Sequence, residues 1–184
     1  MGRGSLACRR RSAVRLTTGM ETLARRDCRR LWLRAGMWET REVADDASVS
    51  LIRVRGLAQE VPYAYAAVPA HDRRLLFTAG ACPLDAEGAI VSAGDLAAQT
   101  RQAMRNLEAA LHAAGAGLDD VVKTTIYVAA SQRDDLVAAW QVIRERFGDH
   151  DAPSTLLGVT MLGYQDQLVE IEAVASVPDL RVHS

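Results

Sequence analysis

The stretch VVKTTIYV, residues 121–128, decides how the rest of the chain is interpreted. It is rich in β-branched side chains and contains neither glycine nor proline, which is typical of a strand inside a sheet. Gly115 and Gly117 stand just before it and end a helical pattern that begins after Asp95. The sequence therefore predicts a helix over about 95–114 that leads into a central strand.

Two segments show the spacing of amphipathic helices. In the first, small or apolar side chains recur every three or four residues and form one stripe, made of Leu96, Thr100, Ala103, Leu107, Ala110, Leu111 and Ala114. The second is predicted over about 133–147, ends at Gly148, and has its stripe at Leu136, Trp140, Ile143 and Phe147. A helix with a single apolar stripe covers one face of a sheet.

Further strands are predicted on both sides of these helices, at 48–55, 74–79, 89–91, 154–161 and 167–177. The resulting order, β-β-β-α-β-α-β-β, predicts an α+β two-layer sandwich with both helices on one face of a mixed sheet. The other face is then either solvated or buried by another subunit. For a domain of only about 130 residues, burial by another subunit is favoured.

The charge pattern divides the chain. Residues 1–41 contain eleven arginines against three acidic residues, a balance of +8, and the remainder carries 11 basic and 20 acidic residues, a balance of −9. We interpret 1–47 as an Arg-rich extension that is either disordered or a misassigned start. The alternative is an arm that binds nucleic acid or an anionic surface, or an organelle-targeting peptide. The domain is predicted at 48–178 and a short tail at 179–184.

Composition excludes several classes of protein. No apolar run approaches the roughly 18 residues that a membrane span requires. The three cysteines and four histidines are scattered, so they predict neither a disulfide framework nor a metal site. This cysteine usage is typical of a reducing compartment, and we expect a cytoplasmic protein.

Several ordered motifs in the domain resemble one known family. They are Leu76-Phe77-Thr78-Ala79-Gly80, Cys82-Pro83-Leu84, Gln99-Thr100, Asn106-Leu107, Leu118 to Thr125, and Val169-Glu170-Ile171-Glu172-Ala173. This pattern resembles the Rid (YjgF/YER057c/UK114) family, the reactive intermediate deaminases, over about residues 50–177. The resemblance implies a chorismate-mutase-like fold that assembles as a homotrimer, with a small-molecule ligand in the cleft between subunits. It also implies hydrolysis of imines and enamines, such as 2-iminopropanoate and 2-iminobutanoate, to 2-oxo acids and ammonia, without a cofactor.

One position that binds the substrate in the family carries a different residue in this chain. Where the family has Ala-Arg-Ser-Thr, this chain has Ala152-Pro153-Ser154-Thr155, so the arginine that holds the substrate carboxylate is Pro153. A guanidinium grips a carboxylate with two hydrogen bonds, and proline offers no donor. The arginines of the two helices, at 101, 105, 144 and 146, are expected on solvated helix faces rather than in its place.

Other family positions are retained. The resemblance implies that Glu170 positions water and that Tyr63, in Pro62-Tyr63, lines the cleft, so these two are the expected catalytic residues. The expected ligand-binding residues are Gly80, Ala79, Pro153, Ser154 and Tyr127. Cys82 is expected to be a buried, unreactive thiol.

Three functions remain open. The favoured one is an imine or enamine hydrolase whose substrate differs from the usual imino acids because of Pro153. The second is a trimer that binds a small metabolite without chemistry. RNA cleavage or translation inhibition is the least favoured, because the domain's −9 charge opposes phosphate binding.

Overall fold

The computed structural model describes Trp38–Thr40 and residues 47–179. The chain divides into two units, 1–37 and 38–184, and every described residue lies in the second. Most of the predicted extension and tail therefore lies outside the described residues. Within the extension, Trp38–Thr40 forms strand β1, which pairs with β2.

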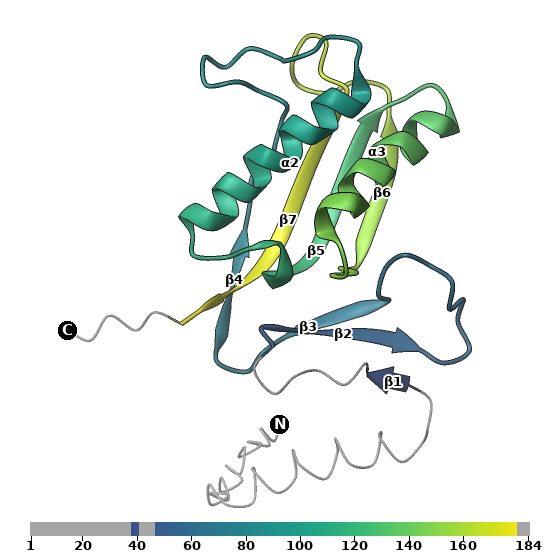
Figure 1. Cartoon of the computed structure of the whole chain (residues 1–184), viewed down its shortest axis with the longest axis vertical. Coiled ribbons are helices and arrows are strands. Elements are labelled where there is room, and N and C mark those ends of the chain that lie inside the picture. Colours follow the sequence, from purple (N-terminus) through teal and green to yellow (C-terminus); the bar gives the residue numbers. More distant parts are fainter. Residues whose placement is uncertain (1–37, 41–46, 180–184) are drawn as a thin grey trace, which may run out of the picture. The chain divides into compact units, whose positions relative to one another are not determined.

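The main sheet has four strands in the order β4-β7-β5-β6 (Figure 1). The bounds are β4 Arg73–Phe77, β5 Val121–Ala129, β6 Ser154–Val159 and β7 Val169–Pro178. β7 is antiparallel to both of its neighbours, and β5 is parallel to β6. The sheet is therefore mixed, as predicted.

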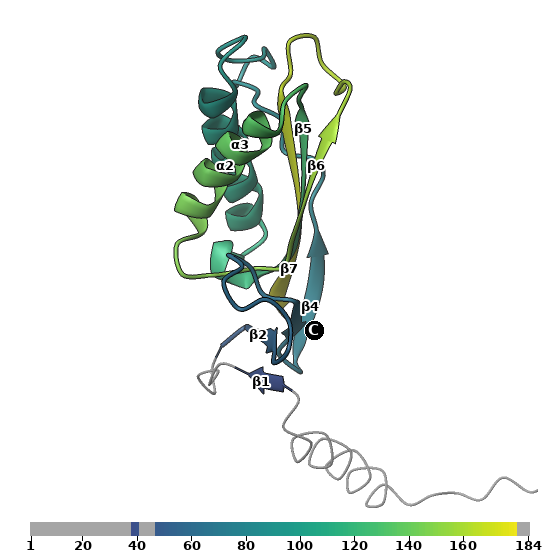
Figure 2. The ribbon, with the colours of Figure 1, turned by 90° about the vertical axis from the view of Figure 1, so that its right-hand side faces the viewer.

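Two crossovers explain why the helices share one face. Helix α2 (Leu96–Ala113) and the short 3₁₀ helix η1 (Leu118–Asp120) connect β4 to β5, and helix α3 (Arg133–Phe147) connects β5 to β6. Both crossovers join parallel strands and step in the same direction across the sheet. Right-handed connections then place both helices on the same side, and Figure 2 shows this two-layer arrangement edge-on.

The core lies between the helices and the inner sheet face. Met104, Leu107, Ile126, Ile143 and Ile171 are buried there with at most 1% of their surface exposed. Both predicted helices are present, but part of the predicted α2 stripe is wrong. The buried α2 positions are Gln99, Thr100, Ala103, Met104, Leu107 and Leu111, whereas Ala110 and Ala114 are exposed.

A second, three-stranded sheet is formed by β1, β2 (Val49–Val54) and β3 (Ala66–Pro69). β2 was predicted, but β3 was not, because its sequence AAVP has two alanines and a proline, which are poor strand residues. The predicted strand at 89–91 is wrong. Only an isolated bridge between Leu84 and Ile90 forms there, beside a turn in which the Asp85 carboxylate accepts the Glu87 and Ala89 N–H groups.

Substituting two methionines tests the observed phase of α2. Met104 is fully buried and Met161 is 78% exposed. We expect Met104→Ala to lower the free energy of unfolding by about 2–5 kcal/mol, because it leaves a cavity in the core. The same change at Met161 should cost less than about 0.5 kcal/mol. Urea unfolding of both variants measures the difference, and equal losses would contradict this packing.

Candidate active site

No helix covers the outer face of the main sheet (Figure 2). This face carries polar side chains where β5 ends and β7 begins. Tyr127 on β5 lies opposite Glu170 on β7, and Glu172 follows two residues later on the same face. All three side chains are partly exposed, whereas their neighbours Ile126 and Ile171 are buried on the inner face. One end of the outer face is thus acidic and accessible.

A bulge after β4 brings backbone against this acidic group. Thr78 N–H bonds to Ala173 O, and Ala81 pairs with Ile171 in both directions. Two residues, Ala79 and Gly80, therefore face the single residue 172 of β7, as in a β-bulge. Bulges of this kind often lie beside active sites, where they re-aim a side chain or a backbone group.

Gly80 is required for the position of Glu170. A Cβ atom on Gly80 would lie 1.7 Å from Glu170 Oε1 and 2.5 Å from Glu170 Cδ. The carboxylate therefore rests directly on the glycine backbone, an approach that no other residue type permits. Gly80 was expected to contact a ligand, and in this structure the group that lies against it is the protein's own carboxylate.

Two side chains flank the Glu170 carboxylate. Gln167 donates from Nε2 to Glu170 Oε2 at 3.1 Å and to Cys82 Sγ at 3.2 Å. Partial burial raises the pKa of the Cys82 thiol above its ordinary value, the negative charge of Glu170 raises it further, and the Gln167 hydrogen bond opposes the rise. Cys82 is therefore a protonated, weakly nucleophilic thiol at neutral pH.

Tyr127 is held by the other carboxylate. Its hydroxyl donates to Glu172 Oε2 at 3.2 Å. Desolvation raises the pKa of Tyr127, and the charges of Glu172 and Glu170 add to the rise. The phenol is therefore protonated at neutral pH and can act as a hydrogen-bond donor on the outer face.

Pro153 and Ser154 lie at the opposite end of β5 and β6. Ser154 pairs with Thr124, three residues before Tyr127, so they stand roughly 10 Å along the strand from the Glu170 group. The Ser154 hydroxyl accepts from Thr124 Oγ1 at 2.7 Å and donates to Ala152 O at 3.0 Å. The Pro153 carbonyl accepts from Thr124 N–H. Their polar groups are thus engaged with neighbouring strands.

Lys123 also lies at this end, and it was not among the site residues predicted from the sequence. The parallel register places it beside Pro153, and its ammonium donates to Thr155 Oγ1 at 2.7 Å and to Thr124 O. Desolvation lowers the pKa of Lys123. A cation therefore stands next to the position from which the arginine is absent, and only the strand register reveals it.

Tyr63 lies on a loop beyond this end. Its ring packs edge-on against Tyr65 at 6.1 Å, and its carbonyl accepts from Arg53 Nη1 at 3.3 Å. The same loop contacts the segment before β6, because Ala64 N–H bonds to Asp151 O at 2.8 Å and the Arg53 guanidinium pairs with the Asp151 carboxylate.

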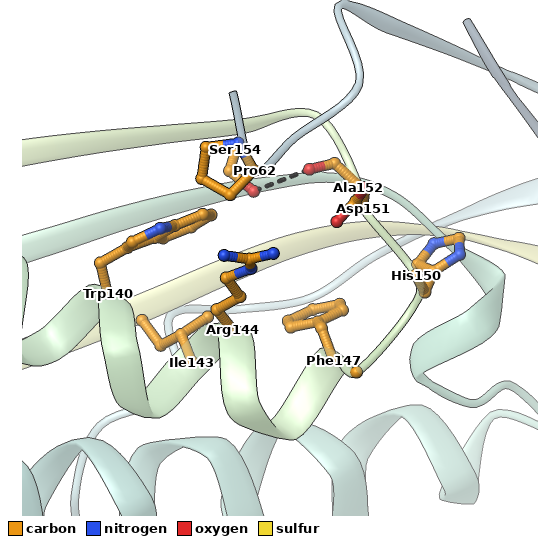
Figure 3. Close-up of a pocket in the computed structure, with 10 residues that line it drawn as sticks. Pro62, Trp140, Ile143, Arg144, Phe147, His150, Asp151, Ala152 and Ser154 are labelled. Carbon is orange, nitrogen blue, oxygen red and sulfur yellow. Dashed lines mark hydrogen bonds between the residues drawn. The ribbon is translucent and has the colours of Figure 1, made fainter. Parts of the chain in front are cut away.

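The pocket between this loop and α3 is small. It has room for about one water, about 10 Å³, and Figure 3 shows Trp140, Arg144 and Phe147 of α3 facing Pro62 and Ser154 across it. An open cavity of about 460 Å³ shares Pro62, Arg144 and Asp151 with it and adds Arg53 and residues 59–61. Arg144 is exposed, as predicted, but it lines both.

Within one chain, the structure brings together Glu170, Gly80, Ala79 and Tyr127, and separates them from Pro153, Ser154 and Tyr63. Among residues 47–179, no group of three or more histidine, cysteine, aspartate or glutamate side chains is placed to hold a metal. No helix in the described part of the chain is long and apolar enough to cross a membrane.

Comparison with known proteins identifies the family to which this chain belongs. A family model described as "Endoribonuclease L-PSP" matches residues 56–177. A RutC family protein of Pyrococcus horikoshii is 38% identical over 100 residues, which cover 54% of this chain and 77% of that protein. A 2-iminobutanoate/2-iminopropanoate deaminase of Salmonella typhimurium is 33% identical over 104 residues, covering 55% of this chain and 78% of the relative.

Among solved structures, a conserved Rid-family protein of unknown function from Yersinia pestis superposes with a TM-score of 0.65 and 32% identity, over 71% of this chain and 99% of that one. The family model, the curated relatives and this structure agree with the motifs and the α+β architecture described above. The chain belongs to the Rid family, the group that the matching model describes as endoribonuclease L-PSP.

Proposed function

We propose that this protein hydrolyses a small imine or enamine to a carbonyl product and ammonia. The observation that carries the proposal is the Glu170 carboxylate, held on the Gly80 backbone by Gln167 and open to the outer face. Relatives at 33% identity are named 2-iminobutanoate/2-iminopropanoate deaminase, which supports this reaction class.

The chemistry needs a base near the water and a donor near the nitrogen. Glu170 takes a proton from water as the water oxygen attacks the imine carbon, and the imine nitrogen gains a proton as the C=N π bond opens, which gives a carbinolamine. A second proton on nitrogen makes ammonia the leaving group. The carbinolamine hydroxyl then gives up its proton as the C=O bond forms and the C–N bond breaks. Tyr63 is the phenol proposed to donate to the ligand, Tyr127 is proposed to contact it, and the Gly80 backbone lies against its reacting end. An enamine first takes a proton on carbon and then follows the same course.

The substrate is held differently from that of relatives with an arginine at position 153. Pro153 removes the bidentate grip, and Ala79 and Leu157 add apolar side chains near the Glu170 end of the outer face. Lys123 offers a single point charge that is already engaged with Thr155 and the Thr124 carbonyl. We therefore propose a substrate that lacks the carboxylate of the usual imino acids or binds it weakly.

We also propose that a second and third copy cover the outer face, so that the cleft lies between subunits of a homotrimer. Leu75, Phe77 and Leu157 expose 49%, 71% and 43% of their surfaces. Phe77 on β4 and Leu157 on β6 lie on the two opposite edge strands of the main sheet. A trimer would bring the Pro153 end of one chain against the Glu170 end of another. That arrangement unites residues that a single chain keeps apart.

A non-catalytic metabolite-binding trimer is the second candidate, favoured by the loss of the arginine at Pro153. RNA cleavage is the third, named in the description of the family model. The acidic balance of the domain opposes it, because phosphate contacts supply most nonspecific affinity for nucleic acid.

Glu170 and Glu172 lie on the same strand face, so comparing their variants distinguishes a catalytic base from a general effect of negative charge. With imines generated in place by an amino-acid dehydratase or oxidase, release of carbonyl product is followed with and without the full chain. We expect Glu170→Gln to lower kcat by about 10²–10⁴-fold, because it removes the base. The matched variant Glu172→Gln should stay within a few-fold. Equal losses, or none, would refute the assigned role.

The Pro153 position tests the substrate. We expect Pro153→Arg to raise kcat/KM for 2-iminobutanoate by about 10–10³-fold, because it restores a charge-assisted, bidentate contact. Pro153→Met removes the ring without adding charge and serves as the control. A wild type already efficient on 2-iminobutanoate would show that the arginine is dispensable here. If neither the wild type nor the arginine variant hydrolyses 2-iminobutanoate, the result favours the non-catalytic metabolite-binding trimer.

Assembly is tested through the exposed outer face. We expect Phe77→Asp to convert a trimer to monomer in size-exclusion chromatography with light scattering, because it places a charge in an apolar interface. Val137→Asp, on α3 and 47% exposed, is the control and should leave the trimer intact. A monomeric wild type would remove the inter-subunit cleft from the proposal.

A further inference from the structure

Gln167 is a buried polar side chain whose amide oxygen and amide nitrogen are both hydrogen-bonded. It is 4% exposed. Its Oε1 accepts from Tyr164 N–H at 3.0 Å, which fixes the orientation of the amide. Its Nε2 faces three acceptors at 3.1–3.2 Å, namely Val169 O, Glu170 Oε2 and Cys82 Sγ. An amide nitrogen has only two hydrogens, so the group is saturated and cannot turn away without losing these bonds.

The backbone around Gln167 is also tied down. Gln99 of α2, fully buried, donates from Nε2 to Asp166 O at 2.9 Å and accepts from Leu168 N–H at 2.8 Å. These two bonds bracket Gln167 on either side. Asp166, whose carbonyl accepts the first of these bonds, has a φ of 62°, a left-handed conformation that non-glycine residues rarely adopt without a fixed surrounding.

We propose that Gln167 is a positioning residue that holds the Glu170 carboxylate on Gly80, and that helix α2 supports it through Gln99. The inference rests on the function proposed above and explains how the Glu170 carboxylate is positioned for it. A glutamate side chain has three rotatable bonds, and on an outer sheet face it would otherwise sample solvent. Gln167 selects the one placement in which Oε1 touches the glycine. A displacement of about 1 Å can cost on the order of 10²-fold in rate.

The kinetic test compares two glutamines of one loop. Gln167→Met keeps the length of the side chain and removes the donors. Gln165→Met acts on an exposed residue whose side chain, within the described part of the chain, bonds to Asp166 Oδ1. We expect Gln167→Met to lower kcat by about 10–10²-fold with KM changed less than about two-fold. Gln165→Met should be unchanged. In a Glu170→Gln background, Gln167→Met should add nothing, since the group that it positions is gone. An additive loss, or a shift confined to KM, would overturn the proposal.

A second variant guards against a simple loss of folding. Gln167→Glu keeps the shape and the oxygen that accepts from Tyr164, but it replaces the donor with a charge facing Glu170. We expect a loss of kcat at least as large as that of Gln167→Met. A wild-type kcat in Gln167→Glu would overturn the positioning role.

Cys82 supplies a readout that needs no turnover. In the full chain with Cys8→Ser and Cys28→Ser, the pH dependence of iodoacetamide alkylation reports the pKa of Cys82. Glu170→Gln should lower that pKa, because the Glu170 charge raises it. In the Gln167→Met background the same change should have a much smaller effect, since Glu170 is no longer held against the thiol. An equal shift in both backgrounds overturns the placement. If Glu170→Gln shifts the Cys82 pKa much less in the Gln167→Met background, but the protein hydrolyses none of the imines, the proposed function is refuted. The positioning of Glu170 by Gln167 is then still supported.

Discussion

The antiparallel pairing of β5 with β7 is the constraint on which the rest of the structure depends. It sets Ile126 opposite Ile171 on the inner face and Tyr127 opposite Glu170 on the outer face. Side chains alternate along a strand, so a slip of one residue would exchange the two faces. Glu170 would then enter the core, where an unpaired charge costs several kcal/mol. The register that makes the core is therefore the register that exposes the candidate site.

Around this ladder, the site is built from the irregular pieces of the fold. The bulge at Ala79 and Gly80 supplies a bare stretch of backbone, and the loop before β7 supplies the Gln167 amide. Neither piece carries charge, and together they define where the Glu170 carboxylate rests. The opposite end of the sheet, near Pro153 and Lys123, is separate within one chain, so assembly and chemistry are coupled in the function proposed here.

The sequence predicted most of the fold because its signals are local. Asp95 caps α2 by accepting the Ala98 N–H at 2.9 Å, and Gly148 ends α3 with a positive φ. The phase of α2 was partly mistaken because alanine fits either helix face. Gln99 is buried to hold a distant loop, which periodicity cannot detect.

The family and its expected residues followed from ordered motifs, but their geometry did not. The contact of Gly80 with Glu170 joins residues ninety positions apart. The placement of Lys123 beside Pro153 follows only from strand register. Both are products of tertiary structure rather than of any local pattern.

The two hydrogen bonds of Gln99 have a consequence for how this protein can diverge. They join main-chain groups at the end of the loop, Asp166 O and Leu168 N–H, and so are indifferent to the side chains before them. Insertions, deletions or new side chains between Thr160 and Gly163 can therefore accumulate without moving the start of β7. Under the function proposed here, the rim of the site could then change to suit another substrate while the placement of Glu170 stays the same.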